Sequence, residues 1–374
     1  MKNTKRLWAL VLTLAMVLAL AACGGSSSSS SGSSGTAAPA TSTTQPASGS
    51  ESQTPAEPTS DKLTVYTAFP ESEVIYYFNK FTEETGIKIE YIRLSAGEML
   101  TRVEAEKDNP QAALMFGGST DNYIAAVDKG LLEPYQSSEL SNTPASYLDP
   151  TGTWNPIYVG CIAFACNSDW FADHGYDYPT SWEDLLDPKY QGEIIMAHPA
   201  TSGTAYTVLA TLVQLKDDEG CWAYLEELNK NMSQFTKSGS AAPNAVALGE
   251  AAIALTFSHD ALQLTPEGYH IVLSFPEDGT GFEVGATALI KGGPADEQAN
   301  AKRFIDWMCS EAGQGCYAEN DSFRVPTNTK APVAEGLVTL DQVPVIDYDA
   351  VWAASNKTEY CNEFEARIVA KPTE

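Results

Sequence analysis

Two spacings of apolar residues alternate along the first part of the folded chain. Alternation with a period of two predicts strands at residues 63–66 and 87–92, and helical spacing predicts helices at residues 74–85 and 98–107. A short apolar run at residues 112–116 predicts a buried strand. Strands that alternate with helices in this way are typical of an α/β fold.

The start of the chain follows a different pattern. Lys2, Lys5 and Arg6 precede an apolar run that is too short for a membrane span, as in a secretory signal. The run ends in Leu-Ala-Ala-Cys23, which resembles the bacterial lipobox, where the cysteine thiol becomes the attachment point of a diacylglycerol. We therefore expect residues 1–22 to be a lipoprotein signal peptide and Cys23 to carry the lipid. The alternative is an ordinary secretory signal with a chance cysteine.

A polar tether follows the anchor. Residues 23–61 contain serine runs, glycines, threonines and prolines with hardly an apolar side chain, so they cannot bury enough surface to offset the entropy lost on ordering. We expect a disordered linker that ties the folded body to the membrane. The remaining residues exceed what one hydrophobic core usually supports, which favours two lobes.

Charge and cysteine content narrow the function classes. A formal net charge of -27 argues against nucleic acid as a partner. Six cysteines besides Cys23 permit three disulfides outside the cytoplasm, and the sequence does not choose the pairing; Cys309 with Cys316 is the local pair to test first. No C-x-x-C spacing occurs and histidines are few, so we expect neither a metal site nor a cofactor.

Three loops that follow predicted strands and open predicted helices are candidate anion sites. They lie at residues 67–71, 117–120 and 200–204. Helix N-termini present free amides and a favourable dipole, and hydroxyls add uncharged donors. Ordinary helix capping by Ser and Thr is the alternative. The candidate residues for the anion end of a ligand are Thr67, Ser119, Thr120, Thr201, Ser202, Gly203 and Thr204.

A second group of polar residues follows the apolar strand predicted at 252–257. Ser258, His259 and Asp260 come directly after that strand, and Glu283 lies further along the chain. Carboxylates and an imidazole accept hydrogen bonds from hydroxyl or ammonium groups, so we assign Ser258, His259, Asp260 and Glu283 to the organic end of a ligand. A structural His259 at the end of the strand is the alternative.

Four motifs make the chain similar to a known family. Phe-Thr-Glu-Glu-Thr-Gly-Ile-Lys-Ile at 81–89, and the segments 128–134, 181–194 and 199–204, resemble the ferric-iron-type branch of bacterial ABC-transporter solute-binding proteins over residues 62–330. The resemblance implies a type II periplasmic-binding-protein fold, in which two α/β lobes joined by two extended hinge crossings close over a ligand.

The apolar runs at 158–167 and 283–290 are the expected crossings. Lobe one is then 62–158 plus part of 286–374, and lobe two is 159–285.

The sequence departs from the iron binders of this family. Those proteins hold the metal with adjacent tyrosines, whereas Ser258 and His259 stand at that position here, and Tyr76-Tyr77 lies inside a predicted helix. Losing the phenolates removes the oxygen ligands that ferric ion prefers. The pattern instead resembles the related binders of phosphorylated sugars and phosphonates. The resemblance therefore implies capture of a hexose phosphate or a phosphonate such as 2-aminoethylphosphonate, with ferric iron as the alternative.

The same resemblance implies partners and a location. We expect a monomer on the extracytoplasmic face of the cell membrane that delivers its ligand to an ABC permease. The run Ser258-His259-Asp260 does not predict a hydrolase, because adjacent residues cannot converge as a catalytic triad and the chain has no G-x-S-x-G motif. We therefore predict a binding protein and not an enzyme.

Overall fold

The computed structural model describes residues 60–370. Its strands are β1 (Lys62–Thr67), β2 (Lys88–Arg93), β3 (Leu114–Ser119), β4 (Leu132–Glu133), β5 (Trp154–Asn167), β6 (Ile194–Ala197), β7 (Met232–Thr236), β8 (Ile253–Phe257), β9 (Ile271–Ser274), β10 (Phe282–Ile290) and β11 (Val325–Pro326). Its α-helices are α1 (Glu71–Thr85), α2 (Ala96–Ala105), α3 (Thr120–Asp128), α4 (Ser168–His174), α5 (Gly203–Leu228), α6 (Ala241–Ala247), α7 (Ser258–Leu262), α8 (Gln298–Cys309), α9 (Glu311–Glu319) and α10 (Ala350–Phe364). Short 3-10 turns lie at Ser138–Asn142, Ala145–Tyr147, Glu183–Leu186, Pro188–Tyr190, Ala295–Glu297 and Leu340–Gln342, and a π-helical turn at Glu365–Val369.

The periodicity predictions for the first part of the body are confirmed. The predicted strands coincide with β1 and β2, and the predicted helices coincide with α1 and α2. The prediction for the next strand is wrong at its end. β3 runs on to Ser119, so Gly117 and Gly118 belong to the strand and not to a loop. Pairing of Ser119 with Gly285 in β10 is what extends the strand.

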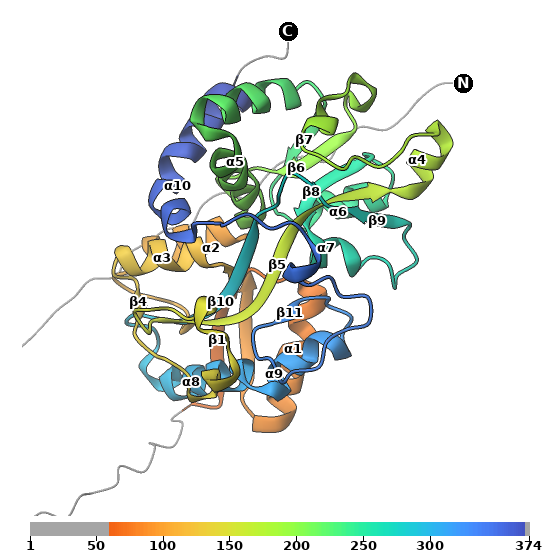
Figure 1. The fold of residues 1–374 in the computed structure, drawn as a ribbon. Helices are drawn as coiled ribbons and strands as arrows, with labels where there is room; N and C mark the ends of the chain where they lie inside the picture. Colours follow the sequence, from red (N-terminus) through yellow and green to blue (C-terminus); the bar gives the residue numbers. More distant parts are fainter. Residues whose placement is uncertain (1–59, 371–374) are drawn as a thin grey trace, which may run out of the picture. The chain divides into compact units, whose positions relative to one another are not determined.

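The strands form two parallel groups joined by antiparallel strands. Their order is β2-β1-β3-β10-β5-β8-β6-β7 (Figure 1). β1 pairs in parallel with β2 and β3, and β6 pairs in parallel with β7 and β8. We call the group around β1 lobe one and the group around β6 lobe two. Helix connections between parallel strands place the carboxyl ends of each group at one edge, where loops can meet a ligand.

β5 passes from one lobe to the other. Its first part pairs with β10 in the sheet of lobe one, and its second part pairs with β8 in the sheet of lobe two. All of its residues before Asn167 are buried, which explains why the segment is an apolar run without polar alternation. β10 runs antiparallel beside it and also pairs with β3. The crossings expected at 158–167 and 283–290 fall on these two strands.

Each lobe has its own core. In lobe one, aromatic residues of α1 and α8 pack against β1 and β3, with Phe78, Phe116 and Phe304 in mutual ring contact. In lobe two, α5 packs against β6 and β8 around the buried Trp182. Because the two cores are separate, β5 and β10 can bend between them without breaking either core.

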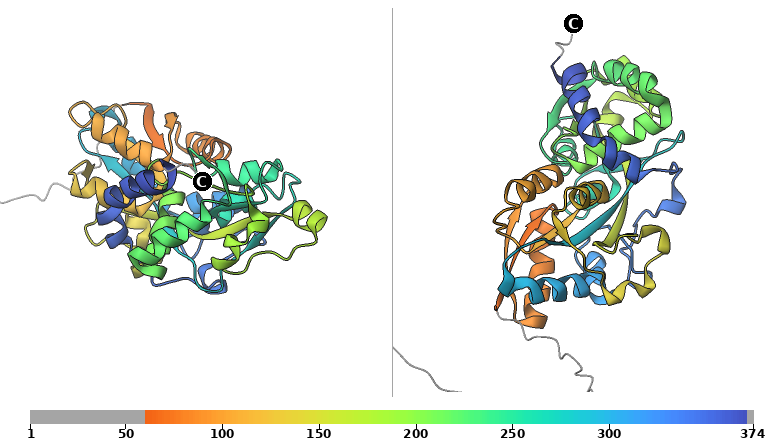
Figure 2. Two further views of the ribbon diagram at one scale, coloured as in Figure 1. Left: turned by 90° about the horizontal axis from the view of Figure 1, so that it is seen from above. Right: turned by 90° about the vertical axis from the view of Figure 1, so that its left-hand side faces the viewer.

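The chain crosses between the lobes a third time near its C-terminus. β11 lies in the sheet of lobe one, whereas α10 packs in the core of lobe two through Ala353 and Phe364 (Figure 1 and Figure 2). The connecting segment is held by backbone hydrogen bonds between Thr280 and both Pro344 (2.8 Å) and Ile346 (2.9 Å). The segment before α10 is therefore fixed at Thr280, just before β10.

The cysteines in the body are buried free thiols. They are Cys161, Cys166, Cys221, Cys309, Cys316 and Cys361. Cys309 and Cys316, the local pair to test, are not bridged. Within residues 60–370, no helix combines the length and the apolar character that a membrane crossing needs. The predicted signal peptide, the lipid site at Cys23 and most of the linker lie outside the described residues.

We expect Gly160→Ala to destabilise the hinge. A Cβ at Gly160 in β5 would stand 2.3 Å from the ring of His259 on lobe two, so the ring or the strand must shift. Overpacking of this kind costs about 1–3 kcal/mol in the free energy of unfolding, which urea denaturation measures. Gly315→Ala in α9 is the matched control, because its Cβ would meet Pro332 at an ordinary 3.4 Å. Equal midpoints for the wild type and Gly160→Ala would contradict the close contact.

Candidate functional site

A small polar cavity lies where the two lobes meet. Its walls come from the loop after β1 and from β2, α2 and β3 of lobe one, from α5, α7 and the loop after β7 of lobe two, and from the crossing strands. Its volume is about 50 Å³, which is room for a few water molecules. The lobes touch around it, since the amide of Gly97 donates to the carbonyl of Thr201 (3.2 Å) and Lys237 pairs with Glu98 (2.6 Å). A solute larger than a few atoms therefore requires the lobes to part.

Three of the helices that begin at the cavity start with a serine N-cap of extended backbone conformation. Ser95, Ser119 and Ser202 are the N-cap residues of α2, α3 and α5, and all three line it. Each N-terminus brings amide donors and the positive end of a helix dipole. α2 and α3 belong to lobe one and α5 to lobe two, so the donors converge only when the lobes meet. This arrangement suits an anion.

Arg93 adds a full positive charge beside these helices. It ends β2, and its side chain lines the cavity. Its guanidinium donates to the carbonyl of Phe69 (3.4 Å) and to the hydroxyl of Ser240 (3.3 Å), both of which are long contacts. Among residues 60–370 no carboxylate forms an ion pair with it. Arg93 therefore keeps donor capacity for a ligand.

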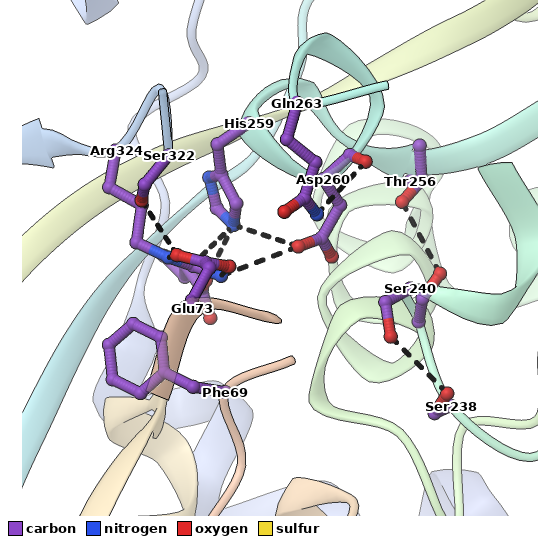
Figure 3. A network of polar contacts seen from close by, with 12 residues as sticks. Phe69, Glu73, Ser238, Ser240, Thr256, His259, Asp260, Gln263, Ser322 and Arg324 are labelled. Atoms are coloured by element: carbon purple, nitrogen blue, oxygen red, sulfur yellow. Dashed lines mark hydrogen bonds and ion pairs between the residues drawn. The ribbon is translucent and has the colours of Figure 1, made fainter. Parts of the chain in front are cut away.

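A second arginine is held by a network of contacts. Nε and Nη2 of Arg324 donate to the two oxygens of Glu73 (2.8 and 2.7 Å), in a bidentate pair (Figure 3). The guanidinium lies 4.6 Å from the ring centre of Phe69 and 4.4 Å from that of Tyr158. Only 3% of the Arg324 side chain is exposed, so the carboxylate and the two rings replace its hydration. This arginine is fixed before any ligand arrives.

Arg324 also reaches lobe two. Its Nη1 lies 2.7 Å from Nε2 of His259, and its Nη2 lies 3.4 Å from Oδ1 of Asp260. A guanidinium only donates, so Nε2 of His259 must accept and the imidazole proton must sit on Nδ1. Burial, followed by the charge of Arg324, holds the pKa of His259 well below its usual range. His259 is therefore a neutral acceptor.

Two carboxyl groups at the cavity have raised pKa values. Burial raises the pKa of Asp260 to about 6, with the charge of Arg324 opposing the shift. Burial raises the pKa of Glu283 to about 8, and Arg324 opposes this shift too. At neutral pH Asp260 is then mostly ionised and Glu283 mostly protonated. The second group can donate as well as accept a hydrogen bond.

Most of the residues predicted from the sequence meet at this cavity. They are Ser119, Ser202, Gly203 and Thr204 from the predicted anion end, and His259, Asp260 and Glu283 from the predicted organic end. The chemistry at the organic end differs from the prediction, because His259 and Asp260 already contact Arg324. Nε2 of His259 and Oδ1 of Asp260 are therefore already in use, whereas Oδ2 of Asp260 is not part of these contacts.

Four predicted residues do not line the cavity. Thr67 is fully buried at the end of β1, where its hydroxyl accepts from the amide of Phe69. Thr201 donates to the carbonyl of Lys237, and Ser258 lies 3.5 Å from the thiol of Cys161.

Thr120, the first residue of α3, lines a different cavity. The hydroxyls of Thr67, Thr201 and Ser258 are thus used in turns and in packing. The capping alternative applies to Ser202, whose side chain accepts from the amide of Ala205 in α5.

The sequence analysis missed the two arginines. Arg93 could have been found, since it lies two residues before Ser95, which forms with Glu98 a capping box that marks a helix start. Arg324 lies in a connecting segment between α9 and β11 with no local pattern. Its role depends on Glu73, which is far away in the sequence.

A second, larger cavity lies between α3, β10 and the C-terminal segment. It holds about 470 Å³ and is mostly apolar, and it shares Ser119 and Glu283 with the first cavity. No arginine or lysine lines it, and the α-helices that begin there are α3 and α10. The smaller cavity is the better candidate because its polar groups converge.

Comparisons with known proteins find similar sequences over most of the folded body. The family model described as bacterial extracellular solute-binding protein matches residues 119–352. An uncharacterized protein of Haemophilus influenzae is 38% identical over 275 residues, which is 72% of this chain and 79% of the relative. A putative 2-aminoethylphosphonate-binding periplasmic protein of Salmonella typhi is 27% identical over 63% of this chain and 69% of its own length.

Solved structures share the fold. The periplasmic binding protein AfuA of Actinobacillus pleuropneumoniae, with fructose-6-phosphate bound, has a TM-score of 0.80 and 31% identity over 83% of this chain and 99% of its own. Iron-bound HitA of Pseudomonas aeruginosa has a TM-score of 0.69 and 22% identity over 81% of this chain and 98% of its own, a likeness of fold alone. The predicted type II periplasmic-binding-protein fold is confirmed.

The raised pKa of Glu283 predicts that the stability of the folded protein depends on pH. The folded protein keeps the Glu283 proton up to a pKa of about 8, whereas the unfolded chain releases it near 4.5, so the folded state binds more protons between these values. The free energy of unfolding should therefore fall as pH rises, by up to about 1.4 kcal/mol per pH unit from this group. Urea denaturation between pH 6.5 and 8 should show this decline in the wild type.

Glu283→Gln should remove this part of the decline. Glu267→Gln, which changes an exposed carboxyl on a loop, is the matched control. If the wild type and Glu283→Gln lose stability in parallel over this range, Glu283 does not hold its proton in the folded state.

Proposed function

Because the chain belongs to the bacterial extracellular solute-binding proteins, we propose that it is the receptor of a bacterial ABC importer for a small anionic organic solute. The ligand class is a hexose phosphate or a phosphonate such as 2-aminoethylphosphonate. The solute is captured between the two lobes and released to an ABC permease. The protein acts as a monomer and needs no cofactor.

One observation carries the choice of an anion. Arg93 lines the cavity without a carboxylate partner among residues 60–370, next to the N-cap serines of three helices. A phosphate or phosphonate oxygen can accept from the guanidinium, from the serine hydroxyls and from the helix amides at once. The net charge of -27 is no obstacle, since these local donors set the potential in a closed cavity.

The other side of the cavity suits hydroxyl or amine groups. Asp260 supplies an anionic acceptor, and Glu283, with its raised pKa, can accept from one hydroxyl and donate to another. His259 is a neutral ring next to them. A solute with an anionic end and a hydroxyl- or amine-bearing end matches this division. Fructose 6-phosphate, which is bound in the Actinobacillus structure, and 2-aminoethylphosphonate, for which the Salmonella relative is named, both belong to this chemical class.

Ferric iron is the weaker alternative. Within residues 60–370 no group of three or more His, Cys, Asp or Glu side chains is arranged to hold a metal ion. The neighbouring tyrosines of α1 are both in use: Tyr76 donates to Glu319, and Tyr77 donates to Glu73. An iron site would require phenolates that these contacts do not leave free.

The proposed receptor catalyses no reaction. The hydroxyl of Ser258 lies beside the thiol of Cys161, whereas Nε2 of His259 faces Arg324. A nucleophile needs a base within hydrogen-bond reach, and these contacts direct the two groups to different partners. Family membership supports binding and transport.

Loss of Arg93 should weaken binding of the anion. Removing a charge-assisted hydrogen bond worth about 1.5–3 kcal/mol lowers affinity roughly 10- to 150-fold. Isothermal titration of Arg93→Ala with fructose 6-phosphate, glucose 6-phosphate and 2-aminoethylphosphonate should show this loss, and Arg93→Lys should retain part of the affinity. Arg303→Ala, which removes an exposed arginine of α8, is the matched control.

The same titrations test the ligand class. If none of these anions gives heat with the wild type, while ferric ion with a synergistic anion produces a visible charge-transfer band, the iron alternative replaces the proposal. Equal affinity of Arg93→Ala and wild type for a phosphate would remove Arg93 from the anion end.

We also propose that Cys23 anchors the receptor on the extracytoplasmic face of the cell membrane through a lipid. The apolar run before it ends in small residues, and the following segment is polar. Cys23→Ala should release the protein into the culture medium or the periplasm, because a single diacylated residue is the proposed attachment. Partition of the wild type and the variant between detergent and aqueous phases measures this, and equal retention in the detergent phase would count against the anchor.

A further inference from the structure

The helix α10 joins the two lobes through one partly buried lysine. Its apolar side packs in the core of lobe two, where the hydroxyl of Tyr206 in α5 donates to the carbonyl of Ala353. Its Lys357 reaches side chains of α3 in lobe one. Figure 1 shows α10 against α5, with one end over α3, and both helices contact α10.

Lys357 has three partners from two lobes. Its Nζ donates to Oδ2 of Asp121 (2.6 Å) and to Oδ1 of Asn122 (2.7 Å), both in α3, and lies 4.8 Å from the ring centre of Tyr206. Side-chain exposure is 12% for Lys357 and 4% for Asp121, so the pair is largely shielded from water. A buried pair of this kind makes the loss of one partner costly, because the other charge remains uncompensated.

The contact to Asn122 fixes a residue of the candidate site. Because an ammonium group only donates, it holds the oxygen of the Asn122 amide and turns the NH₂ group toward Ser119. That NH₂ group donates to the hydroxyl (3.3 Å) and the carbonyl (3.4 Å) of Ser119. Ser119 is the N-cap of α3 at the cavity, and a Cβ on Gly203 of lobe two would stand only 2.6 Å from its hydroxyl.

The contact to Asp121 compensates a negative charge in the first turn of α3. Asp121 follows the N-cap serine of α3 by two residues, in the first turn of the helix. An uncompensated carboxylate there would oppose an anion at the same helix N-terminus. Lys357 supplies the balancing charge, and it can do so only while α10 and α3 are in contact.

We propose that Lys357 is a positioning residue that couples closure of the lobes to binding of the anion. In the closed arrangement it neutralises Asp121 and orients Ser119 through Asn122. When the lobes part, the Lys357 contacts to lobe one are lost and the anion end is no longer complete. The inference rests on the proposed function for its ligand, whereas its effect on closure needs no ligand.

The first experiment measures closure without ligand. Nitroxide labels at Lys107 of lobe one and Lys230 of lobe two, both exposed, report the distance between the lobes by pulsed electron paramagnetic resonance. In the full-length chain, Lys357→Met should shift the distance distribution toward the open arrangement. Lys330→Met, which removes an exposed lysine outside α10, should leave it unchanged. An unchanged distribution in Lys357→Met overturns the proposed role in closure.

The second experiment measures the anion, with glucose 6-phosphate and 2-aminoethylphosphonate as probes. Lys357→Met should lower affinity by about tenfold or more, since it leaves Asp121 unpaired beside the anion end. Adding Asp121→Asn to Lys357→Met should restore part of the affinity, because the opposing charge is gone. A merely structural helix contact would not recover when its second partner is removed, so no recovery overturns the charge role.

The two experiments separate the two proposals. A wild type that binds neither probe contradicts the proposed function, and the distance measurement still decides whether Lys357 controls closure. A wild type that binds a probe with the same affinity as Lys357→Met contradicts the inference alone. Unfolding midpoints for each variant exclude general loss of structure as the cause of weaker binding.

Discussion

The buried charge of Arg324 is the constraint on which the rest of the site depends. A guanidinium that loses its hydration must be paired, and Glu73 in α1 accepts from both Nε and Nη2 of Arg324. Its remaining nitrogen meets His259 of lobe two. The segment that carries Arg324, the first helix of lobe one and the helix after β8 are thereby held in one arrangement. This pairing also makes His259 a neutral acceptor and leaves the chemistry of the anion to other residues.

The anion end and the organic end are built from different kinds of groups. Neutral or partly charged donors at the starts of α2, α3 and α5 line the cavity together with Arg93, whereas the carboxyl groups come from α7, with Asp260, and from the crossing strand β10, with Glu283. Carboxylates near a phosphate would repel it, and burial reduces that cost by keeping Glu283 protonated at neutral pH. An acidic protein can thus present a local environment that favours an anion.

A carboxylate near the anion end is also compensated by the C-terminal helix α10. Asp121 stands in the first turn of α3, where a carboxylate stabilises the helix but opposes an anionic ligand. Lys357 compensates that charge from a helix that belongs to the other lobe. The third crossing of the chain therefore links the geometry of the hinge to the electrostatics of the cavity.

The sequence by itself determined the α/β class, the first strands and helices, and the loops that meet at the cavity, because hydrophobic periodicity and helix starts are local properties. Ser119, Ser202 and His259 were within reach of this reasoning. Only the tertiary structure decided that Thr67 and Ser258 face away from the cavity, and that Arg324 pairs with Glu73. Pairing between residues 251 positions apart leaves no pattern in the chain, since it depends on how β5 and α1 pack and not on neighbouring residues.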